Sequence, residues 1–270
     1  MAKTSAMNNS QLLHGKRALV FGAGGSVGAA VASEFAAEGA EVYLCGRNAK
    51  SIEEVKRSIT DAGGWARTAV VDALDKAAVQ KCVDEIARAA GSIDIEFNAV
   101  APRVEEYGGG KPAVDVTIDE YMVALSTMVK SPIITALAAA RHMMKQRSGV
   151  IIGVTGSTAR GHLVGGTSIG VAFGALETFL ENLAFELGPQ GVRAVCLRVT
   201  ANADSNAIRS IARATNITDE QMSANLASLN FLKIAMKVVE TAKAAALIAS
   251  DRFRHLTGTV LNSSAGAGLD

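Results

Sequence analysis

The chain has few of the residues that mark a secreted, metal-binding or nucleic-acid-binding protein. It holds three cysteines in 270 residues, far apart at positions 45, 82 and 196, and no CxxC pair. This spacing excludes a disulfide framework and predicts reduced, buried thiols in a cytoplasmic protein. The four histidines are scattered, so no metal cluster is expected. The formal net charge of +1 predicts no strongly basic face, and nucleic acid is therefore not an expected partner.

Long hydrophobic runs are also missing from the sequence. The longest apolar stretches, such as Pro132–Ala140, are too short to cross a membrane, so no membrane association is expected. The opening residues, MAKTSAMNNSQLLHGK, are polar and lack the apolar centre of a signal peptide. We therefore expect residues 1–14 to form a flexible tail. No break in composition follows, and residues 15–270 are predicted to form one domain.

Proline and aromatic residues are scarce, with 4 prolines and 4% aromatic side chains, whereas glycine is abundant at 26 residues. Short apolar runs alternate with helical patterns along the whole chain. Continuous apolar runs indicate strands that are buried on both faces of a parallel sheet. The sequence thus predicts a Rossmann-like, doubly wound α/β fold with a mostly parallel sheet and helices on both faces. The expected strands are residues 17–22, 41–45, 66–71, 93–98, 149–154, 192–199 and 259–262.

The first expected strand runs into a glycine-rich turn, GAGGSVG, at residues 22–28. Between a strand and a helix, such glycines permit a tight turn, let a pyrophosphate approach the backbone, and let the helix pack closely. The free N–H groups and positive dipole at the start of the helix favour the phosphates. The residues predicted to contact the cofactor here are Gly22, Gly24, Gly25, Ser26, Val27 and Gly28. A glycine turn that binds no ligand is the alternative interpretation.

Two further strand ends bear on the choice of cofactor. The second strand ends in Cys45-Gly46-Arg47, without the carboxylate that holds the ribose 2′-hydroxyl of NAD. Arg47 can instead pair with a 2′-phosphate, so NADP(H) is favoured over NAD(H), unless Arg47 is only a surface charge. After the third strand, Asp72, which precedes Ala73, either accepts a hydrogen bond from the adenine amino group or caps the next helix. We include both residues in the expected cofactor site.

Four segments, in this order, resemble motifs of the short-chain dehydrogenase/reductase family. FGAGGSVG is similar to the family's TGxxxGxG, IDIEFNAVA to the strand that ends in NNAG, ELGPQGVRAVCLRVT to ELxxxGIRVNxVxPG, and LTGTVLNSSAG to ITGxxxxVDGG. The resemblance runs from about Gly15 to Gly266 and adds Asn98 and Ala99 to the expected cofactor site. It implies a seven-stranded sheet, a nicotinamide cofactor, and a small-molecule substrate under a lid segment at about residues 202–233. It also implies a homodimer or homotetramer built on two long central helices.

The catalytic positions of the family are where this sequence departs from it. Ser157, in VTGSTAR, matches the family's serine. Gly170 and Gly174 stand at the positions of its tyrosine and lysine, and Met128 stands at that of its asparagine. Reduction of a carbonyl by hydride needs an acid that protonates the developing alkoxide, and the tyrosine and lysine would supply it. The two glycines are expected to leave a groove on the helix face toward the nicotinamide.

Other residues are candidates for the missing acid. His162 lies in the loop after the fifth strand, and histidine exchanges protons near neutral pH; an ordinary surface histidine is the alternative. Tyr107 and Lys111 form a YxxxK string in a glycine-rich loop, where a non-catalytic surface loop is the alternative. Arg103 and Arg160 either hold an anionic group of the substrate or face the solvent.

Two functions are open at this point. The first is an NADP(H)-dependent oxidoreductase acting on a small carbonyl or alcohol, in which Ser157 orients the substrate oxygen and His162 or Tyr107 supplies a proton. The second is a binding, sensing or scaffold subunit that keeps the cofactor and has lost the chemistry. The glycine turn favours a cofactor in both, whereas the glycines at 170 and 174 favour the second.

Overall fold

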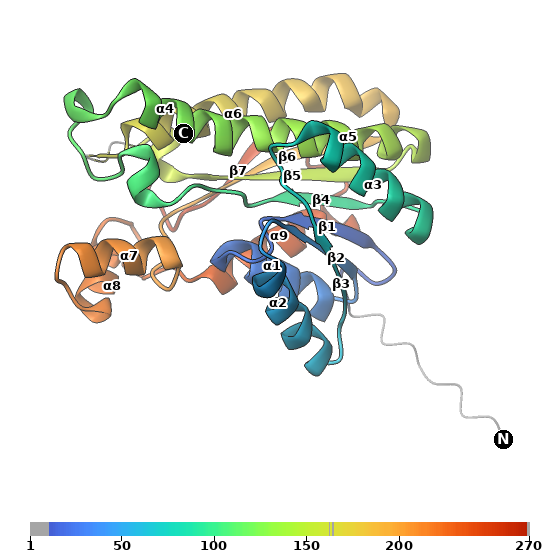
Figure 1. The fold of residues 1–270 in the computed structure, drawn as a ribbon, viewed down its shortest axis with the longest axis horizontal. Coiled ribbons are helices and arrows are strands. Elements are labelled where there is room, and N and C mark those ends of the chain that lie inside the picture. Colours follow the sequence, from blue (N-terminus) through green and yellow to red (C-terminus); the bar gives the residue numbers. More distant parts are fainter. Residues whose placement is uncertain (1–10, 162, 164, 269–270) are drawn as a thin grey trace.

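The computed structural model describes residues 11–161, 163 and 165–268, and one seven-stranded sheet lies within them. Its strands are β1 (Arg17–Phe21), β2 (Glu41–Gly46), β3 (Trp65–Val70), β4 (Ile95–Asn98), β5 (Gly149–Gly156), β6 (Val192–Val199) and β7 (Thr259–Ser263). All neighbours are parallel, in the order β3-β2-β1-β4-β5-β6-β7 (Figure 1). The direction of winding reverses between β1 and β4, so the predicted doubly wound fold is confirmed.

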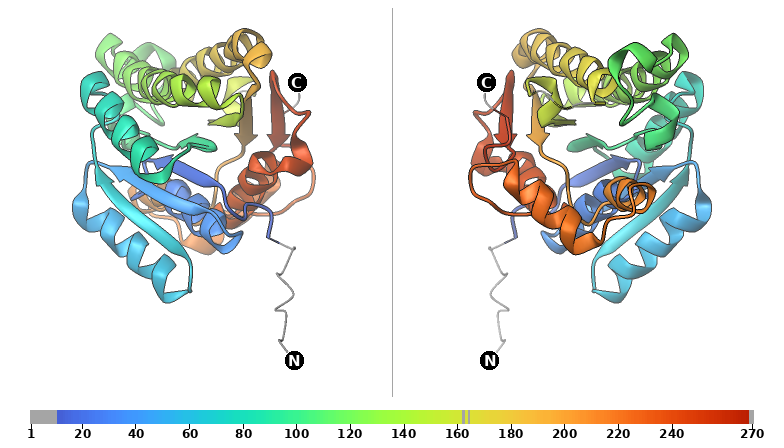
Figure 2. Two further views of the ribbon diagram at one scale, coloured as in Figure 1. Left: turned by 90° about the vertical axis from the view of Figure 1, so that its right-hand side faces the viewer. Right: turned by 90° about the vertical axis from the view of Figure 1, so that its left-hand side faces the viewer.

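Helices cover both faces of this sheet. They are α1 (Ser26–Ala37), α2 (Ala49–Asp61), α3 (Lys76–Ala90), α4 (Ile118–Leu125), α5 (Ser131–Gln146), α6 (Thr167–Leu187), α7 (Asn206–Ala214), α8 (Asp219–Ser228) and α9 (Val238–Ala249). One face carries α1, α2 and α9, and the other carries α3, α5 and α6 (Figure 2). The pair α7 and α8 lies beyond the edge formed by the carboxyl ends of the strands (Figure 1).

Alternate residues of each strand face opposite helix layers, because side chains along a strand point to the two faces in turn. On β1, Ala18 and Val20 belong to the core under α1 and α9, whereas Leu19 and Phe21 belong to the core under α3, α5 and α6. All four are buried. Burial on both faces is the reason that these strands are continuous apolar runs in the sequence.

The longest helical run is continuous from residue 118 to residue 146. α4 passes through a π-helical segment, η3 (Ser126–Lys130), directly into α5. The sequence predicts helix here, with Pro132 as the place where it would break. The structure shows no break, because Pro132 lies in the first turn of α5. Proline has no N–H to donate to the carbonyl four residues before it, so one helical hydrogen bond is missing there. The wider π turn directly before α5 accommodates this missing bond.

The same run, Ile118–Gln146, is long and apolar enough to cross a membrane by length and composition, with a mean hydropathy of 1.5. The predicted absence of such a stretch is therefore wrong. In the fold, α5 packs on β4, β5 and α3, and α4 packs on α6. A helix that covers a sheet can have the same length and hydropathy, so one such helix is weak evidence for a membrane span.

The segment before β1 is attached to the sheet domain from residue 11 onward. Leu13 is fully buried, and its N–H donates to the Glu38 carbonyl at 2.9 Å. The N–H of Leu12 donates to the Glu38 carboxylate at 2.7 Å. The predicted tail of residues 1–14 thus includes residues that pack into the fold, while residues 1–10 lie outside the described part.

One carboxyl group lies in the core of the sheet. Glu96 of β4 stands between Leu19 of β1 and Ile151 of β5, and it is 1% exposed. Its Oε1 has no hydrogen-bond partner among the described residues. Burial raises the pKa of Glu96 to about 8, and the Thr135 side chain opposes only part of this shift. The carboxyl is therefore mostly protonated in the native protein at neutral pH.

This burial predicts a pH dependence of stability. Between about pH 4.5 and 8 the unfolded chain releases the Glu96 proton and the native chain keeps it. The free energy of unfolding should therefore fall as pH rises through this window, by about 1.4 kcal/mol per pH unit from this group. We expect Glu96→Gln to remove that slope and to be the more stable protein at pH 8. Urea unfolding at pH 5 to 8 measures it.

A matched control for this experiment is Glu105→Gln, at an exposed position. Its free energy of unfolding should follow that of the unchanged protein at every pH. If the curves for Glu96→Gln and the unchanged protein run parallel from pH 5 to 8, Glu96 is already ionised in the native state and the inference is wrong.

Candidate active site

The turn between β1 and α1 is built from close backbone contacts. Gly22 has φ +75°, and a Cβ there would lie 2.8 Å from the carbonyl carbon and oxygen of Ala99. A Cβ on Gly28 would lie 2.2 Å from the carbonyl oxygen of Gly22. A larger residue at either position would push α1 or the end of β4 away. Gly25 is the N-cap of α1 and offers no side-chain hydrogen bond. The first N–H groups of α1 are thus uncapped by a side chain, as phosphate binding requires.

The predicted lid segment reaches this turn. The N–H of Asn206, at the start of α7, donates to the Ser26 hydroxyl at 2.9 Å. Further along, the N–H groups of Phe231 and Leu232 donate to the carbonyl of Ala265 at 3.0 and 3.2 Å. These hydrogen bonds help to hold residues 202–233 across the carboxyl edge of the sheet. Val27 lies half-buried in the first turn of α1.

Asn98 and Ala99 fix the end of β4. The Asn98 amide nitrogen donates to the Thr135 hydroxyl at 2.9 Å, and its amide oxygen accepts from the N–H of Val100 at 2.9 Å. The Ala99 N–H donates to the Phe21 carbonyl at 3.0 Å. The side chain of Asn98 is buried and fully engaged, so its part in the site is to hold the backbone of residues 98–100 against the glycine turn.

Arg47 follows β2 directly and is exposed. It forms no ion pair within the described part of the chain. The pKa of Glu106 is lowered first by hydrogen bonds from Arg103 and to a smaller extent by the charge of Arg47. Arg47 therefore lies near the short 3-10 helix η1 (Val104–Tyr107), with its guanidinium available to an anion.

Asp72 does not cap the helix that follows it. Its carboxylate accepts from the N–H of Leu74 at 3.0 Å, whereas Asp75 accepts from the first N–H groups of α3. The prediction that Asp72 caps the next helix is therefore wrong. Asp72 instead closes the turn that separates β3 from α3, and Asp75 is the cap of α3. Ala73 is buried beside it.

Ser157 stands at the carboxyl end of β5, in the short 3-10 helix η4 (Ser157–Ala159). Its hydroxyl makes no hydrogen bond with the residues that the structure describes, and it is half-buried. A Cβ on Gly268 would lie 3.3 Å from the Ser157 Cβ, so the end of the described chain passes close to this serine. A free hydroxyl at the carboxyl edge of a parallel sheet is suited to bind a ligand oxygen.

Tyr107 is 8% exposed and packs in a small cluster with Ala124 and Ala172. Burial raises the pKa of its hydroxyl above the usual value, with a smaller contribution from Glu105, which makes it a weaker acid. Lys111 is held elsewhere, in an ion pair with Glu120. The YxxxK string therefore does not place an ammonium beside a phenol, and His162 lies outside the described residues.

Gly170 and Gly174 lie one turn apart on α6, but their surroundings differ. A Cβ on Gly170 would lie 2.9 Å from the Thr158 carbonyl oxygen, whereas a Cβ on Gly174 meets no atom within 4 Å. The predicted groove over both glycines is therefore corrected. Open space exists at Gly174, and the backbone of η4 occupies the space at Gly170. Met128 lies in the π-helical segment and packs against the Tyr107 cluster.

A buried ion pair near this helix was not found from the sequence. The guanidinium of Arg198 on β6 binds Glu177 of α6 through two bonds, Nε to Oε1 at 2.8 Å and Nη2 to Oε2 at 2.9 Å. Both side chains are 1% exposed. The Thr155 hydroxyl donates to Oε1 at 2.9 Å, and the Nε of Arg160 lies 3.7 Å from Oε2. In the sequence, this ion pair is indicated only by one charged residue inside each of two apolar segments, CLRV and ALETFL.

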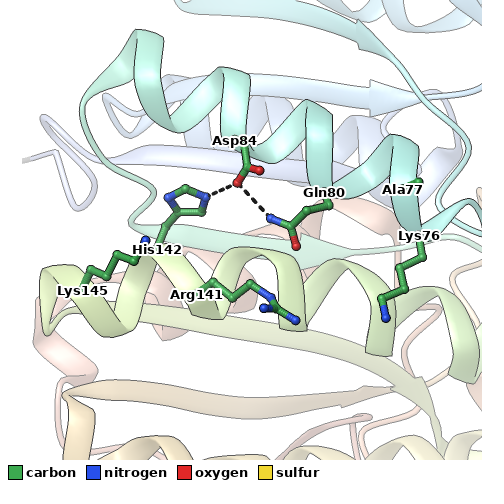
Figure 3. A pocket seen from close by; sticks show the side chains of 7 residues that line it. All are labelled: Lys76, Ala77, Gln80, Asp84, Arg141, His142 and Lys145. Carbon is green, nitrogen blue, oxygen red and sulfur yellow. Dashed lines mark hydrogen bonds and ion pairs between the residues drawn. The ribbon is translucent and has the colours of Figure 1, made fainter.

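A separate open groove of about 590 Å³ lies between α3 and α5 (Figure 3). His142 Nε2 lies 2.6 Å from the Asp84 carboxylate, which also accepts from Gln80, and the histidine contact lowers the pKa of Asp84. The residues that line it are Lys76, Ala77, Gln80, Asp84, Arg141, His142 and Lys145. None of them belongs to the expected site.

The chain matches known proteins over most of its length. A family model described as enoyl-(acyl carrier protein) reductase matches residues 22–267. A short-chain dehydrogenase/reductase of Colletotrichum higginsianum is 30% identical over 70% of this chain and 70% of the relative. A 7α-hydroxysteroid dehydrogenase of Clostridium sardiniense is 27% identical over 95% of both. A solved 7α-hydroxysteroid dehydrogenase complexed with NADH and 7-oxo glycochenodeoxycholic acid is 26% identical, with a TM-score of 0.84 over 98% of this chain and 99% of that chain.

The different surroundings of the two α6 glycines predict opposite responses to alanine. Gly174→Ala adds a methyl group in open space and should raise the free energy of unfolding by about 0.5–1 kcal/mol, as expected for a helix interior. Gly170→Ala meets the Thr158 carbonyl and should lower it instead. Urea denaturation of both variants measures the difference. Equal stabilisation by the two would mean that η4 does not approach α6 as described.

Proposed function

The chain belongs to the short-chain dehydrogenase/reductase family, and we propose that it is an NADP(H)-dependent oxidoreductase of small carbonyls or alcohols with an atypical active site. Members of the family are oxidoreductases that use NAD(P)(H). The observation that carries the proposal is the backbone cradle at Gly22 and Gly28, which leaves the start of α1 open, with the Ser157 hydroxyl at the same edge of the sheet.

The residues of this chain fit the cofactor group by group. The N–H groups in the first turn of α1, which no side chain caps, suit the pyrophosphate, and Arg47 suits a 2′-phosphate because no carboxylate ends β2. Asp72 and Ala73 would border the adenine, while Asn98 and Ala99 would support the backbone beneath the cofactor. When bound, the nicotinamide supplies or accepts the hydride.

The substrate oxygen would bind to the Ser157 hydroxyl, which stabilises the charge that develops on it. In the proposed site, Gly170 and Gly174 take the places of the family's tyrosine and lysine, so the usual acid is missing. Tyr107 is a poor substitute because its buried hydroxyl has a raised pKa and its carbonyl, not its hydroxyl, bonds Ser168. His162 remains the proposed proton donor of this site.

A specific observation favours a second candidate function. A Cβ at position 170 would lie 2.9 Å from the Thr158 carbonyl oxygen, which is too close for a side chain, so the backbone of η4 is adapted to a glycine there. Such adaptation is expected in a subunit that keeps the cofactor for binding, sensing or scaffolding and no longer transfers a hydride.

We also propose that copies of the chain associate through α4, α5 and α6 as a homodimer or homotetramer. These helices expose large apolar side chains on their outer side, and burial of such a surface favours association. The residues are Ile118, Met122, Leu137, Met144, Val171 and Phe185. A small-molecule substrate and a cytoplasmic location complete the proposal.

NADPH fluorescence tests the cofactor. We expect NADPH to bind more tightly than NADH, and Arg47→Ser to weaken NADPH about 10- to 100-fold while leaving NADH unchanged, because only the phosphate pairs with the guanidinium. Arg57→Ser, at an exposed position on α2, is the control and should change neither affinity. If neither dinucleotide binds to the unchanged protein, both candidate functions are refuted.

Turnover separates the two candidates. With NADPH bound, a panel of small ketones and aldehydes should be reduced, and Ser157→Ala should lower kcat about 10²- to 10³-fold, because the developing alkoxide loses its hydrogen bond. NADPH absorbance at 340 nm follows the reaction. Tight binding without turnover across the panel would favour the binding subunit and count against the oxidoreductase.

A further inference from the structure

We propose that Arg160 is the residue that selects the substrate, and that it binds the carboxylate of a small oxo or hydroxy acid whose reacting oxygen lies on Ser157. This inference rests on the proposed function and narrows its substrate class. Its physical basis is an exposed guanidinium that starts one turn after the Ser157 hydroxyl and lies against a buried carboxylate whose oxygens already accept other hydrogen bonds.

Ser157 and Arg160 belong to one 3-10 turn. The N–H of Arg160 donates to the Ser157 carbonyl at 3.2 Å, which closes the turn over three residues. Arg160 is the C-cap of this short helix, so its long side chain starts one hydrogen-bonded turn after Ser157 and can reach a small ligand that binds the Ser157 hydroxyl.

Glu177 attracts the Arg160 guanidinium but accepts no hydrogen bond from it. Both oxygens of the Glu177 carboxylate already accept short hydrogen bonds, from Arg198 and from Thr155. The Nε of Arg160 approaches the same carboxylate only to 3.7 Å, which is longer than a hydrogen bond. The Glu177–Arg198 pair is buried and fixed between α6 and β6, and the Glu177 carboxylate attracts the nearby Arg160 guanidinium by charge. The terminal nitrogens of Arg160 form no hydrogen bond with the described residues.

The surroundings leave room for a ligand. The side chain of Arg160 is 56% exposed, and Gly174, three residues before Glu177 on α6, has no atom within 4 Å of the position of a Cβ. A guanidinium binds a carboxylate through two parallel hydrogen bonds and is the side chain best matched to that group. The planar fork of Arg160 would thus fix the acid end of the substrate while Ser157 holds the other oxygen.

The activity test compares an acid with its neutral ester. With NADPH, 3-oxobutanoate should have a kcat/KM about 10- to 100-fold above that of methyl 3-oxobutanoate. Arg160→Gln should remove this preference by lowering the value for the acid and leaving the ester unchanged, and Arg160→Lys should keep part of it. Arg88→Gln, an equal loss of charge at an exposed position on α3, should keep the full preference.

A binding test keeps the inference separate from the proposed function. Calorimetry of 3-hydroxybutanoate and its methyl ester, with the NADPH complex and with the protein alone, measures carboxylate recognition without turnover. Weaker binding of the acid to Arg160→Gln supports the inference even if no substrate is reduced. If the unchanged protein binds acid and ester equally, or if Arg160→Gln binds the acid as well as the unchanged protein does, the inference is overturned while NADPH binding and reduction of the ester stand.

Discussion

The tight backbone contacts where β1 turns into α1 are the constraint on which the candidate site depends. A Cβ on Gly28 would lie 2.2 Å from the carbonyl oxygen of Gly22, and a Cβ on Gly22 would lie 2.8 Å from that of Ala99. These contacts set how close α1 lies to the sheet, bring the end of β4 against the turn, and leave the helix N-terminus facing outward. The lid segment is positioned from the same turn, through the Ser26 hydroxyl. One local constraint therefore aligns three segments that are distant in the sequence.

The sequence predicted the sheet well because its signal is local. Apolar runs that are buried on both faces, separated by helical patterns, are sufficient to predict a parallel sheet, and β6 matches its predicted ends. The deviations come from long-range packing. β5 extends to Gly156 because it pairs with the full length of β6. The helix of residues 118–146 does not break at Pro132 because Pro132 lies in the first turn of α5 and the π turn before it packs on α6. Neither partner is visible in the local pattern.

The candidate site was harder to predict than the fold, for the same reason. The glycine turn could be predicted because its chemistry is tied to a local strand–turn pattern, and Ser157 because a short segment around it resembles a family motif. Tyr107 lay in a glycine-rich segment, and only the structure shows that it packs under α4 and α6. The pair of Glu177 and Arg198 could not be paired from the sequence, because 21 residues and a change from helix to strand separate them. Charged residues inside apolar segments were the sign that a partner had to exist.

The two glycines of α6 and the buried pair belong to one arrangement. α6 contributes three consecutive turns to the site, with Gly170, Gly174 and Glu177 in sequence. The missing side chain at Gly170 lets the backbone of η4 approach, and the missing side chain at Gly174 leaves open space. At Glu177, a carboxylate is held by Arg198. A charge that is buried must be paired, and the charge next to it is drawn to the same place. The position of Arg160, one turn after Ser157, is thus influenced by a carboxylate in the interior of the protein.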